Sequence, residues 1–582
     1  MSDELDSLWD VVVVGSGGAG LTAATTAAHA GLRVLVVEKA AWVGGATAWS
    51  GGNVWVPGNG LCKETSSHPS PSPGSDRQDA RRYLLALAQE FANPELLDAF
   101  LAAAPRMVAF LQEHTAVQFE CQPRFGDHHP HIGGACGSGR CITPVPFDGR
   151  LLGKRLNDLR EPLPQVNAPF GMMIGFDDIE PLQCVTRSAR AFVHVIGMVA
   201  RLLRDRWRYG RGTRLTMGNA LAARLLRSAL DNNVTIWNNT PALRLLQTER
   251  RVRGVVVERE GREITVGARR GVFLASGGFS ASDALRRQFM PRPQQHLSMM
   301  PDTHTGDGLQ MAQRVGAALE TRHYRNGDWT VISAMENANG SLTKCLHTVL
   351  DKPKPGCIAV DGRGARFVNE AGSEIADALH HDAVLPAYLI CDQRFLRKYG
   401  LGLVPPGGFA VKRYQAAGYL HSAPDIATLA ASLQVDGERL TETVTRFNRF
   451  AIAGEDLDFG RGASHADRLL GDSDHHPNPS LGALQQPPFH AVQIHPGDAS
   501  SWVGLRINRY AQVLRDGGSV VSGLYAGGLD AHSLWRGRPP SVGANNALSL
   551  TLGFLAGEHM AGVSEAGEET CPNSTARDHC NP

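Results

Sequence analysis

The sequence predicts an α/β protein in which a Rossmann-type dinucleotide-binding domain is interrupted by an inserted α+β domain. Three observations support this fold class. The apolar, β-branched run Val11–Val14 leads directly into a glycine-rich turn, as in a central parallel strand of such a domain. With 582 residues, the chain is too long for a single hydrophobic core. The Rossmann pattern is also replaced by mixed segments over about 280–486 before it resumes.

The turn after the first strand has the spacing of a phosphate-binding motif. Gly15, Gly17 and Gly20 form GxGxxG: the first permits a tight turn, the second lets the backbone approach a pyrophosphate, and the third allows the next helix to pack closely. We expect that helix over about 21–30. A second short strand then ends at Glu38, where a carboxylate would bind ribose hydroxyls. The motif alone is often a simple turn, but this order of elements favours a dinucleotide site.

A second run of small residues, Gly44–Gly52 (GGATAWSGG), follows the acid. Such bare backbone suits close contact with an extended, buried ligand. The run resembles the flavoprotein superfamily of fumarate reductases and 3-ketosteroid Δ1-dehydrogenases, in which GG(T/A)(S/T)xxSGG lies along the flavin. The resemblance implies FAD as the cofactor. Because no histidine lies between Lys39 and Leu61 to form a covalent flavin link, we expect non-covalent FAD.

Other motifs extend the resemblance over nearly the whole chain and favour the ketosteroid dehydrogenase branch. They are PFDGRLLG at 146–153, ASGGF at 275–279, TGDG at 305–308, GARFVNE at 364–370, DFGRG at 458–462, PPFHAV at 487–492, GLYAGG at 523–528 and a glycine turn at 541–553. The resemblance implies a Rossmann-type FAD-binding domain formed by 1–279 and 487–562, with an inserted α+β substrate domain, 280–486. The polar tail, 563–582, is expected to be disordered.

The glycine-rich segments and the matching motifs supply the expected cofactor contacts. A helix that begins just after Gly543 would place its positive end against the flavin pyrimidine edge. The residues that we expect to bind FAD are Gly15, Ser16, Gly17, Gly18, Ala19, Gly20, Glu38, Lys39, Gly44, Gly45, Ala46, Thr47, Ser50, Gly51, Gly52, Ala242, Ala275, Gly277, Gly278, Asp307, Gly527, Gly528, Ala544, Asn545, Ala547 and Leu548.

The resemblance also implies catalytic positions. In the ketosteroid dehydrogenases a tyrosine base abstracts a proton beside a ketone and a hydride passes to flavin N5. A second tyrosine assists, and a third polarises the ketone together with a glycine N–H. Aligned by the motifs, the base position is Glu374, the assisting position is His128 or His129, and the third tyrosine is replaced by Pro539. Only the glycine, Gly543, is retained.

These positions predict an FAD-dependent dehydrogenase that desaturates a C–C bond beside the carbonyl of a bulky apolar, ketosteroid-like substrate. An external acceptor, such as a quinone, would take the electrons. Two alternatives stay open: an ene-reductase that runs the chemistry in the opposite direction, and a flavin-binding electron-transfer or assembly protein without substrate chemistry of its own. Fumarate reductases use arginines where this chain has Glu374 and Pro540, so a dicarboxylate substrate is disfavoured.

Composition and charge argue against several other classes. A net charge of +1 gives no basis for nucleic-acid binding. The acidic first ten residues have no apolar core, so we expect no secretory signal, and no run reaches the ~18 apolar residues of a membrane-spanning helix. The ten cysteines lack close pairing, so we expect reduced thiols in a cytoplasmic protein. The Cys- and His-rich segment 121–141 lacks the ligand spacing of a zinc site, so we expect no metal there.

The segment 187–214 is basic and amphipathic. The simpler interpretation is a helix with a solvated arginine face. The alternative is peripheral contact with an anionic membrane surface, from which a quinone or an apolar substrate is drawn.

Overall fold

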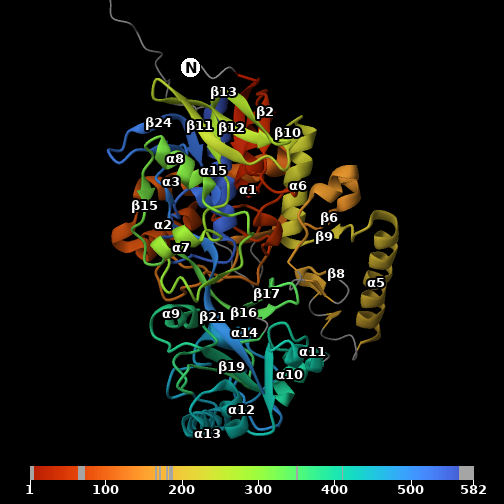
Figure 1. Cartoon of the computed structure of the whole chain (residues 1–582). Helices are drawn as coiled ribbons and strands as arrows, with labels where there is room; N and C mark the ends of the chain where they lie inside the picture. The colour runs from red at the N-terminus through yellow and green to blue at the C-terminus, as the bar shows by residue number, and fades with distance from the viewer. Residues whose placement is uncertain are drawn as a thin grey trace, which may run out of the picture.

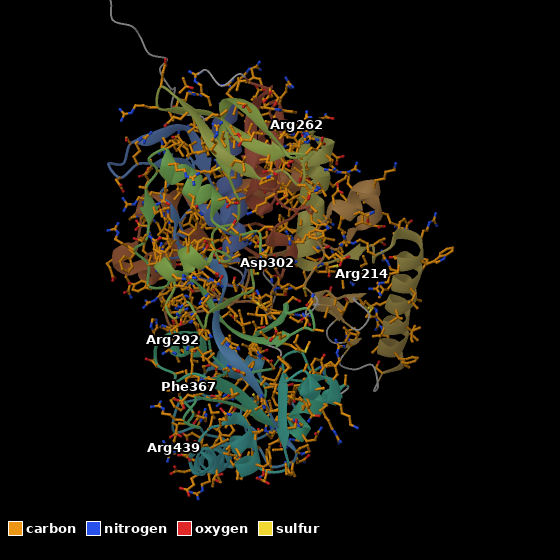
Figure 2. The ribbon with its side chains drawn as sticks, in the orientation of Figure 1. Arg214, Arg262, Arg292, Asp302, Phe367 and Arg439 are labelled. Carbon is orange, nitrogen blue, oxygen red and sulfur yellow. A yellow bond between two sulfur atoms is a disulfide. The ribbon has the colours of Figure 1, made fainter. Side chains whose placement is uncertain are left out.

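The computed structural model describes residues 5–62, 73–163, 167–168, 172–178, 181–182, 188–348, 351–408 and 410–562, so the predicted disordered tail, 563–582, lies outside the described residues. The chain forms two bodies, each built on its own large sheet, and helix α5 lies at the side of both (Figure 1). Figure 2 shows Asp302 at the level where the bodies meet, with Arg262 in the first body and Phe367 and Arg439 in the second.

An eight-stranded sheet forms the centre of the first body. Its order is β10-β2-β1-β13-β12-β11, with β24 beside β13 and β23 beside β24. Strands β10, β2, β1, β13 and β24 are paired in parallel, whereas β11, β12 and β13 form an antiparallel meander. The bounds are β1 (Ser7–Val14), β2 (Val34–Val37), β10 (Thr235–Trp237), β11 (Ala242–Thr248), β12 (Arg251–Arg259), β13 (Arg262–Leu274), β23 (Gln512–Leu514) and β24 (Val520–Ala526).

Helix α1 lies between α15 and α6 and packs on β1 and β2. Its small side chains let α15 approach closely. A Cβ atom at Gly553 would lie 2.4 Å from the Ala19 carbonyl oxygen, and one at Gly557 would lie 2.7 Å from Thr26 Cβ, so these positions of α15 require glycine. The helices of the first body are α1 (Gly18–His29), α2 (Pro73–Ala88), α3 (Pro94–His114), α6 (Met217–Asp231), α7 (Asp283–Phe289), α8 (Asp307–Arg314) and α15 (Ala544–Ala561).

A seven-stranded sheet forms the centre of the second body. Its order is β17-β16-β21-β19-β18, and β14 and β20 also pair with β21. The strands are β14 (Leu297–Ser298), β16 (Gly327–Glu336), β17 (Leu342–His347), β18 (Cys357–Val360), β19 (Ala387–Asp392), β20 (Leu420–Ala423) and β21 (Phe489–Ser501). The helices are α9 (Glu374–His381), α10 (Gln393–Tyr399), α11 (Val411–Ala416), α12 (Ile426–Leu433), α13 (Gly437–Ala453) and α14 (His465–Leu470).

Strand β21 lies on the other side of the expected boundary at 486/487. The motif match at 487–492 placed it in the returning part of the FAD-binding domain, but its first half pairs with β19 and its second half with β16. The strand therefore belongs to the second sheet, and the chain returns to the first body only after Ser501. A motif match locates a segment along the chain but not its pairing partners.

Two of the motifs are locked together inside the second body. Arg461, from DFGRG, contacts Glu370, from GARFVNE, with 2.7 Å between Nη1 and Oε1 and no exposure of either side chain. The other oxygen of Glu370 lies 3.0 Å from Arg366, which also pairs with Asp456 at 2.9 Å. One buried carboxylate thus neutralises charge on two buried arginines and joins the two segments.

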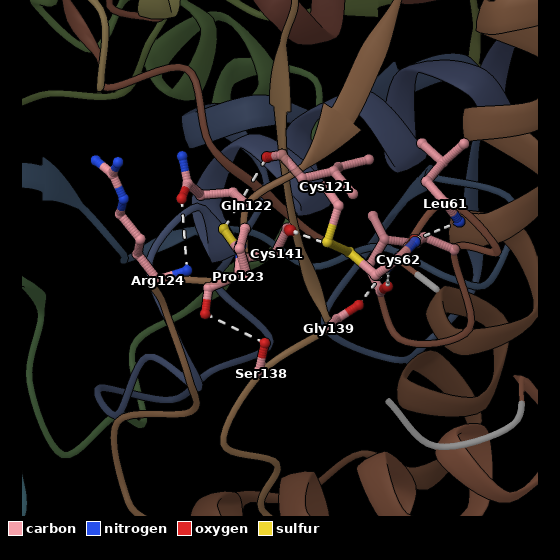
Figure 3. The surroundings of a disulfide bond; sticks show 12 residues. Leu61, Cys62, Cys121, Gln122, Pro123, Arg124, Ser138, Gly139 and Cys141 are labelled. Carbon is pink, nitrogen blue, oxygen red and sulfur yellow. Dashed lines mark hydrogen bonds between the residues drawn. A yellow bond between two sulfur atoms is a disulfide. The ribbon is translucent and has the colours of Figure 1, made fainter. Parts of the chain in front are cut away.

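A small three-stranded sheet, β3-β5-β4, carries a disulfide bond (Figure 3). Its strands are β3 (Val54–Trp55), β4 (Phe119–Cys121) and β5 (Cys141–Pro144). Cys62 and Cys121 are bonded, with their Cα atoms 4.9 Å apart. The expectation of reduced thiols throughout is therefore wrong for this pair. Their sequence separation of 59 residues conceals a proximity that the pairing of β3, β5 and β4 creates.

Helix α5 (Ala189–Tyr209) is the predicted basic amphipathic segment and stands apart from both bodies (Figure 1). Among the helices that the structure describes, none combines the length and the apolar character needed to cross a membrane. The remaining two-stranded pairs are β6 (Phe147–Asp148) with β9 (Arg214–Leu215), β7 (Asn167–Ala168) with β8 (Met172–Met173), and β15 (Leu319–Glu320) with β22 (Gly504–Leu505).

The Glu370 network predicts a large stability effect. Glu370→Ala leaves Arg366 and Arg461 without their shared buried carboxylate, which should lower the free energy of unfolding by ~3–5 kcal/mol. Guanidinium denaturation of the purified protein measures the loss. Glu438→Ala, on the exposed side of α13, is the matched control. Equal stability of the two variants would contradict the assigned role of the network.

Candidate functional site

The turn between β1 and α1 depends on its glycines. Gly15 has a φ of +102°, and a Cβ atom there would lie 2.2 Å from the Ala275 carbonyl oxygen. A Cβ atom at Gly20 would lie 2.0 Å from the Gly15 carbonyl oxygen, whereas one at Gly17 meets no heavy atom within 4 Å. The backbone at Gly17 therefore faces open space beside the N-terminus of α1, where an anionic group can approach.

Glu38 is buried at the end of β2 and holds the turn from the other side. Its Oε2 atom accepts hydrogen bonds from the Ser16 N–H at 2.9 Å and the Ser16 hydroxyl at 2.5 Å, and Oε1 accepts from the Ala40 N–H at 2.8 Å. The next residue, Lys39, contacts Asp307 at 2.9 Å. These contacts bring the acid, the glycine turn and the TGDG segment together.

The second small-residue run, 44–52, lies along the first. The Gly18 N–H donates to Thr47 Oγ1 at 3.0 Å. A Cβ atom at Gly45 would lie 3.3 Å from Gly17 Cα. Both glycine-rich segments therefore contribute backbone to one surface, as the sequence led us to expect.

The start of α15 meets the same run. Gly543 has a φ of +86° and precedes the helix, and a Cβ atom there would lie 2.5 Å from the Asn53 carbonyl carbon. Asn546, in the first turn, donates to the Ser50 hydroxyl at 3.2 Å. The positive end of α15 is thus directed at the segment that follows the second glycine run.

Asp530 orients the ASGGF loop, and the sequence motifs did not single it out. Its carboxylate accepts hydrogen bonds from the N–H groups of Ser276 at 2.5 Å and Gly278 at 3.0 Å, while burial raises its pKa. Nearby, a Cβ atom at Gly528 would lie 3.3 Å from Ala19 Cβ. An acid two residues after the glycines that follow a buried strand was the available signal.

The histidine segment lies against the chain that precedes α15. The His128 N–H donates to the Pro540 carbonyl oxygen at 2.9 Å, and the Tyr83 hydroxyl donates to the same oxygen at 2.8 Å. Burial lowers the pKa of His128, and burial with the neighbouring His128 and His131 lowers that of His129 to about 4. Both imidazoles are therefore neutral near pH 7. They can exchange a proton or hydrogen-bond a carbonyl, but they carry no charge.

Glu374 lies in the second body as the first residue of α9, and its side chain is exposed. One turn further on, Asp377 pairs with Arg325, and burial raises the pKa of Asp377 while that arginine opposes the rise. The charge of Arg325 also contributes to the lowered pKa of His129. The first turn of α9 and the histidine segment therefore lie within range of the same arginine.

Comparison with known proteins identifies the cofactor. Residues 10–544 match a family described as FAD binding domain. The chain belongs to this family. A 3-oxosteroid 1-dehydrogenase of Mycobacterium tuberculosis is 33% identical over 572 residues, which cover 95% of this chain and 98% of that protein. A 4-oxocyclohex-2-ene-1-carboxylate 5-dehydrogenase of Sinomonas cyclohexanicum is 34% identical over 572 residues, which cover 96% of this chain and 95% of that protein.

A solved structure supports the same assignment. The 3-ketosteroid Δ1-dehydrogenase of Sterolibacterium denitrificans, in complex with 1,4-androstadiene-3,17-dione, is 31% identical and aligns with a TM-score of 0.87 over 96% of this chain and 100% of that one. These similarities confirm the predicted fold class and family resemblance, and the cofactor is FAD. The protein is an FAD-dependent oxidoreductase, so the alternative without substrate chemistry is not retained.

The residues of this chain fit FAD. The open space at Gly17 suits the pyrophosphate, Glu38 lies beside it for the ribose, and α15 directs its positive end toward the expected position of the flavin. Ala242 pairs with Val257 in the meander and lies two residues after Thr240, whose N–H donates to the Glu38 carbonyl oxygen at 2.8 Å. The individual contacts stay predictions.

The absence of a histidine between Lys39 and Leu61 predicts non-covalent FAD. Acid precipitation of the purified, yellow protein should leave the flavin in the supernatant, where its absorbance measures the yield. Flavin that stays with the pellet would show a covalent link and contradict the prediction.

Proposed function

We propose that the protein desaturates the C–C bond beside the carbonyl of a cyclic ketone, with ketosteroid-like molecules as the first candidate substrates. Bound FAD supplies the hydride acceptor. The observation that carries the proposal is the similarity over the whole chain to the ketosteroid dehydrogenase of Sterolibacterium denitrificans, at a TM-score of 0.87. The Mycobacterium tuberculosis relative, similar over 95% of this chain, supports it.

Glu374 is our proposed proton-abstracting base. It occupies the position of the family's catalytic tyrosine, four residues after Glu370, whose buried ion pairs hold the preceding loop. A carboxylate needs less activation than a tyrosine, whose ordinary pKa is about 10. His128 or His129, neutral in this structure, would relay the proton onward, and the N–H of Gly543 would hold the ketone oxygen.

A smaller, charged ketone is the second candidate substrate. The Sinomonas cyclohexanicum relative is named for a 4-oxocyclohexene carboxylate. Arg325 is a cation near His129 and α9, and its guanidinium lies 5.9 Å from the Trp329 ring centroid. Because Asp377 already pairs with this arginine, a substrate carboxylate would have to compete with that ion pair.

Glu374→Gln tests the base and the reaction together. Anaerobic mixing of wild-type protein with a saturated 3-ketosteroid should bleach the flavin absorbance in a stopped-flow spectrometer. The variant should do so ~10²–10⁴-fold more slowly, because it lacks a group able to accept the proton. Its FAD content should be unchanged. Glu438→Gln, exposed on α13, is the control for a general effect of removing a carboxylate.

Other outcomes separate the alternatives. Bleaching by an oxocyclohexane carboxylate but not by the steroid would favour the second substrate class. Reoxidation of the photoreduced protein by an enone, with no reduction by saturated ketones, would favour the ene-reductase. Bleaching of Glu374→Gln at the wild-type rate would eliminate Glu374 as the base.

The proposal extends to peripheral contact between α5 and an anionic membrane, where a quinone would accept the electrons. Four apolar side chains follow one another along the outer face of α5 at helical spacing: Phe192, Ile196, Leu203 and Trp207 are 53%, 51%, 60% and 88% exposed. Exposed apolar side chains in one stripe, with a tryptophan near one end, are typical of a helix that lies in the membrane interface.

The charges of α5 complement such a surface. The helix carries five arginines and a single acid, Asp205. Asp205 is buried against the segment that follows the helix, where Thr213 donates to it at 2.6 Å, and Arg201 and Arg204 contact it. The acid therefore faces inward, while Arg206 and Arg208 are exposed beside the apolar stripe. Anionic headgroups would attract these arginines.

Co-sedimentation with vesicles tests the membrane contact. The wild-type protein should pellet with vesicles rich in phosphatidylglycerol and less with pure phosphatidylcholine, and salt should weaken the binding. Leu203→Ser with Trp207→Ser should weaken it by about 10²- to 10⁴-fold, since each of the two buried side chains contributes about 1.5–3 kcal/mol. Leu457→Ser, which changes a leucine that is 71% exposed outside α5, is the control. Vesicle binding that this control reduces equally would contradict a specific role for α5.

A further inference from the structure

A carboxylate lies among the first residues of β16, at a half-buried position between two buried ones. Gly327 and Trp329 are buried, and Asp328 between them keeps partial exposure. Its Oδ2 atom accepts a hydrogen bond from Asn545 Nδ2 at 3.1 Å, and the same Nδ2 lies 3.3 Å from the Ser500 hydroxyl. Within the described residues, Oδ1 of Asp328 has no hydrogen-bond partner, so this oxygen is free for a ligand.

Asn545 places this carboxyl group next to the expected ketone site. It is the second residue of α15, the helix that begins directly after Gly543. The Gly543 N–H, the expected ketone contact, also has no acceptor in the part of the chain that the structure describes. Pro539, at the position of the third tyrosine, has neither a hydroxyl nor an N–H. The site therefore lacks one hydrogen-bond donor, and Asp328 is joined through Asn545 to the helix turn that carries the donor that remains.

We propose that Asp328, held by Asn545, donates a hydrogen bond to the ketone oxygen of the substrate and so replaces the missing tyrosine. The inference rests on the proposed function. No covalent bond forms in this step. Below the pKa of Asp328 the carboxyl proton is on Asp328 in the free protein. It is shared with the ketone oxygen as negative charge develops there, while the base on α9 takes the proton from carbon.

The surroundings of Asp328 allow it to carry that proton. Burial, with a smaller contribution from the negative charge of Asp498, raises its pKa to about 6, while Arg325 and the Asn545 hydrogen bond oppose the rise. Arg325 is partly neutralised by Asp377. A substrate that fills the space around Oδ1 removes water and favours the neutral acid still more.

The other titratable groups nearby are already engaged. On β21, Asp498 accepts from His296 at 2.7 Å. On α9, His380 stacks on Trp329 with ring centroids 4.1 Å apart, and burial lowers its pKa to about 3, so it is neutral near pH 7. Asp328, whose raised pKa is about 6, therefore lies among groups that already have partners.

Ketone binding to the oxidised, FAD-loaded protein tests the inference without turnover. A 3-keto-1,4-diene steroid, already desaturated at the reacting bond, is titrated while the flavin absorbance reports binding. For wild-type protein, binding should be tightest at low pH and weaken by about three- to tenfold as the pH rises through the pKa of Asp328, because the ionised form cannot donate. Asp328→Asn, whose amide donates at every pH, should bind with little pH dependence. Asp328→Ala should bind about three- to tenfold more weakly than wild type at low pH and also be independent of pH.

The experiment distinguishes failure of this inference from failure of the proposed function. Absence of steroid binding to wild-type protein, with no flavin reduction by any cyclic ketone, would remove the proposed function and this inference with it. Steroid binding that weakens with pH equally in wild type and Asp328→Asn would overturn the inference alone. So would an Asp328→Asn variant that binds normally but reduces its flavin as slowly as Glu374→Gln, because Asp328 would then be the base. Retained FAD absorbance in each variant confirms that the protein is folded.

Discussion

Close backbone contact between segments from the two ends of the chain organises the molecule. The turn at Gly15 and Gly20 packs against Ala275, and α15 reaches α1 where Gly553 lies against Ala19. A side chain at any of these glycines would overlap backbone atoms, so the segments meet in this way or the FAD site does not form. The long stretch of chain between them must therefore leave the first sheet and return to it, and this is what makes the second body an insertion.

The parts of the fold that could be predicted from sequence are those with short-range signals. The strand, glycine turn, helix and second strand from β1 to β2 follow one another within the first 37 residues, and each pattern specifies the next element. Strand β21 could not be placed in the same way, because its partners β16 and β19 lie far away in the sequence. The Cys62–Cys121 bond has the same origin, since only the pairing of β3, β5 and β4 brings the two sulfur atoms together.

Some residues of the candidate site could be located from sequence motifs, and others could not. Family motifs located Glu374, His128, His129 and Gly543, but motifs describe what relatives retain. They say nothing of Asp328, a position with no motif, or of Asp530, whose carboxylate serves backbone N–H groups. A physical signal existed in both cases. An acid inside or directly after a buried strand must have a partner, since its desolvation is otherwise too costly.

Strand β21 also constrains how the two bodies can move. It begins in the middle of the second sheet and ends against the FAD-binding body, where the Phe279 N–H donates to the Ser501 hydroxyl at 3.3 Å and Asn545 reaches Ser500. A strand with neighbours on both sides bends little along its length. The C-terminal end of β21 contacts the ASGGF loop and the start of α15, so this end moves together with the second sheet. Any tilt of the second body would therefore shift the backbone at Phe279 and Asn545 at the same time, and the position of the second body would be mechanically coupled to the environment of the cofactor.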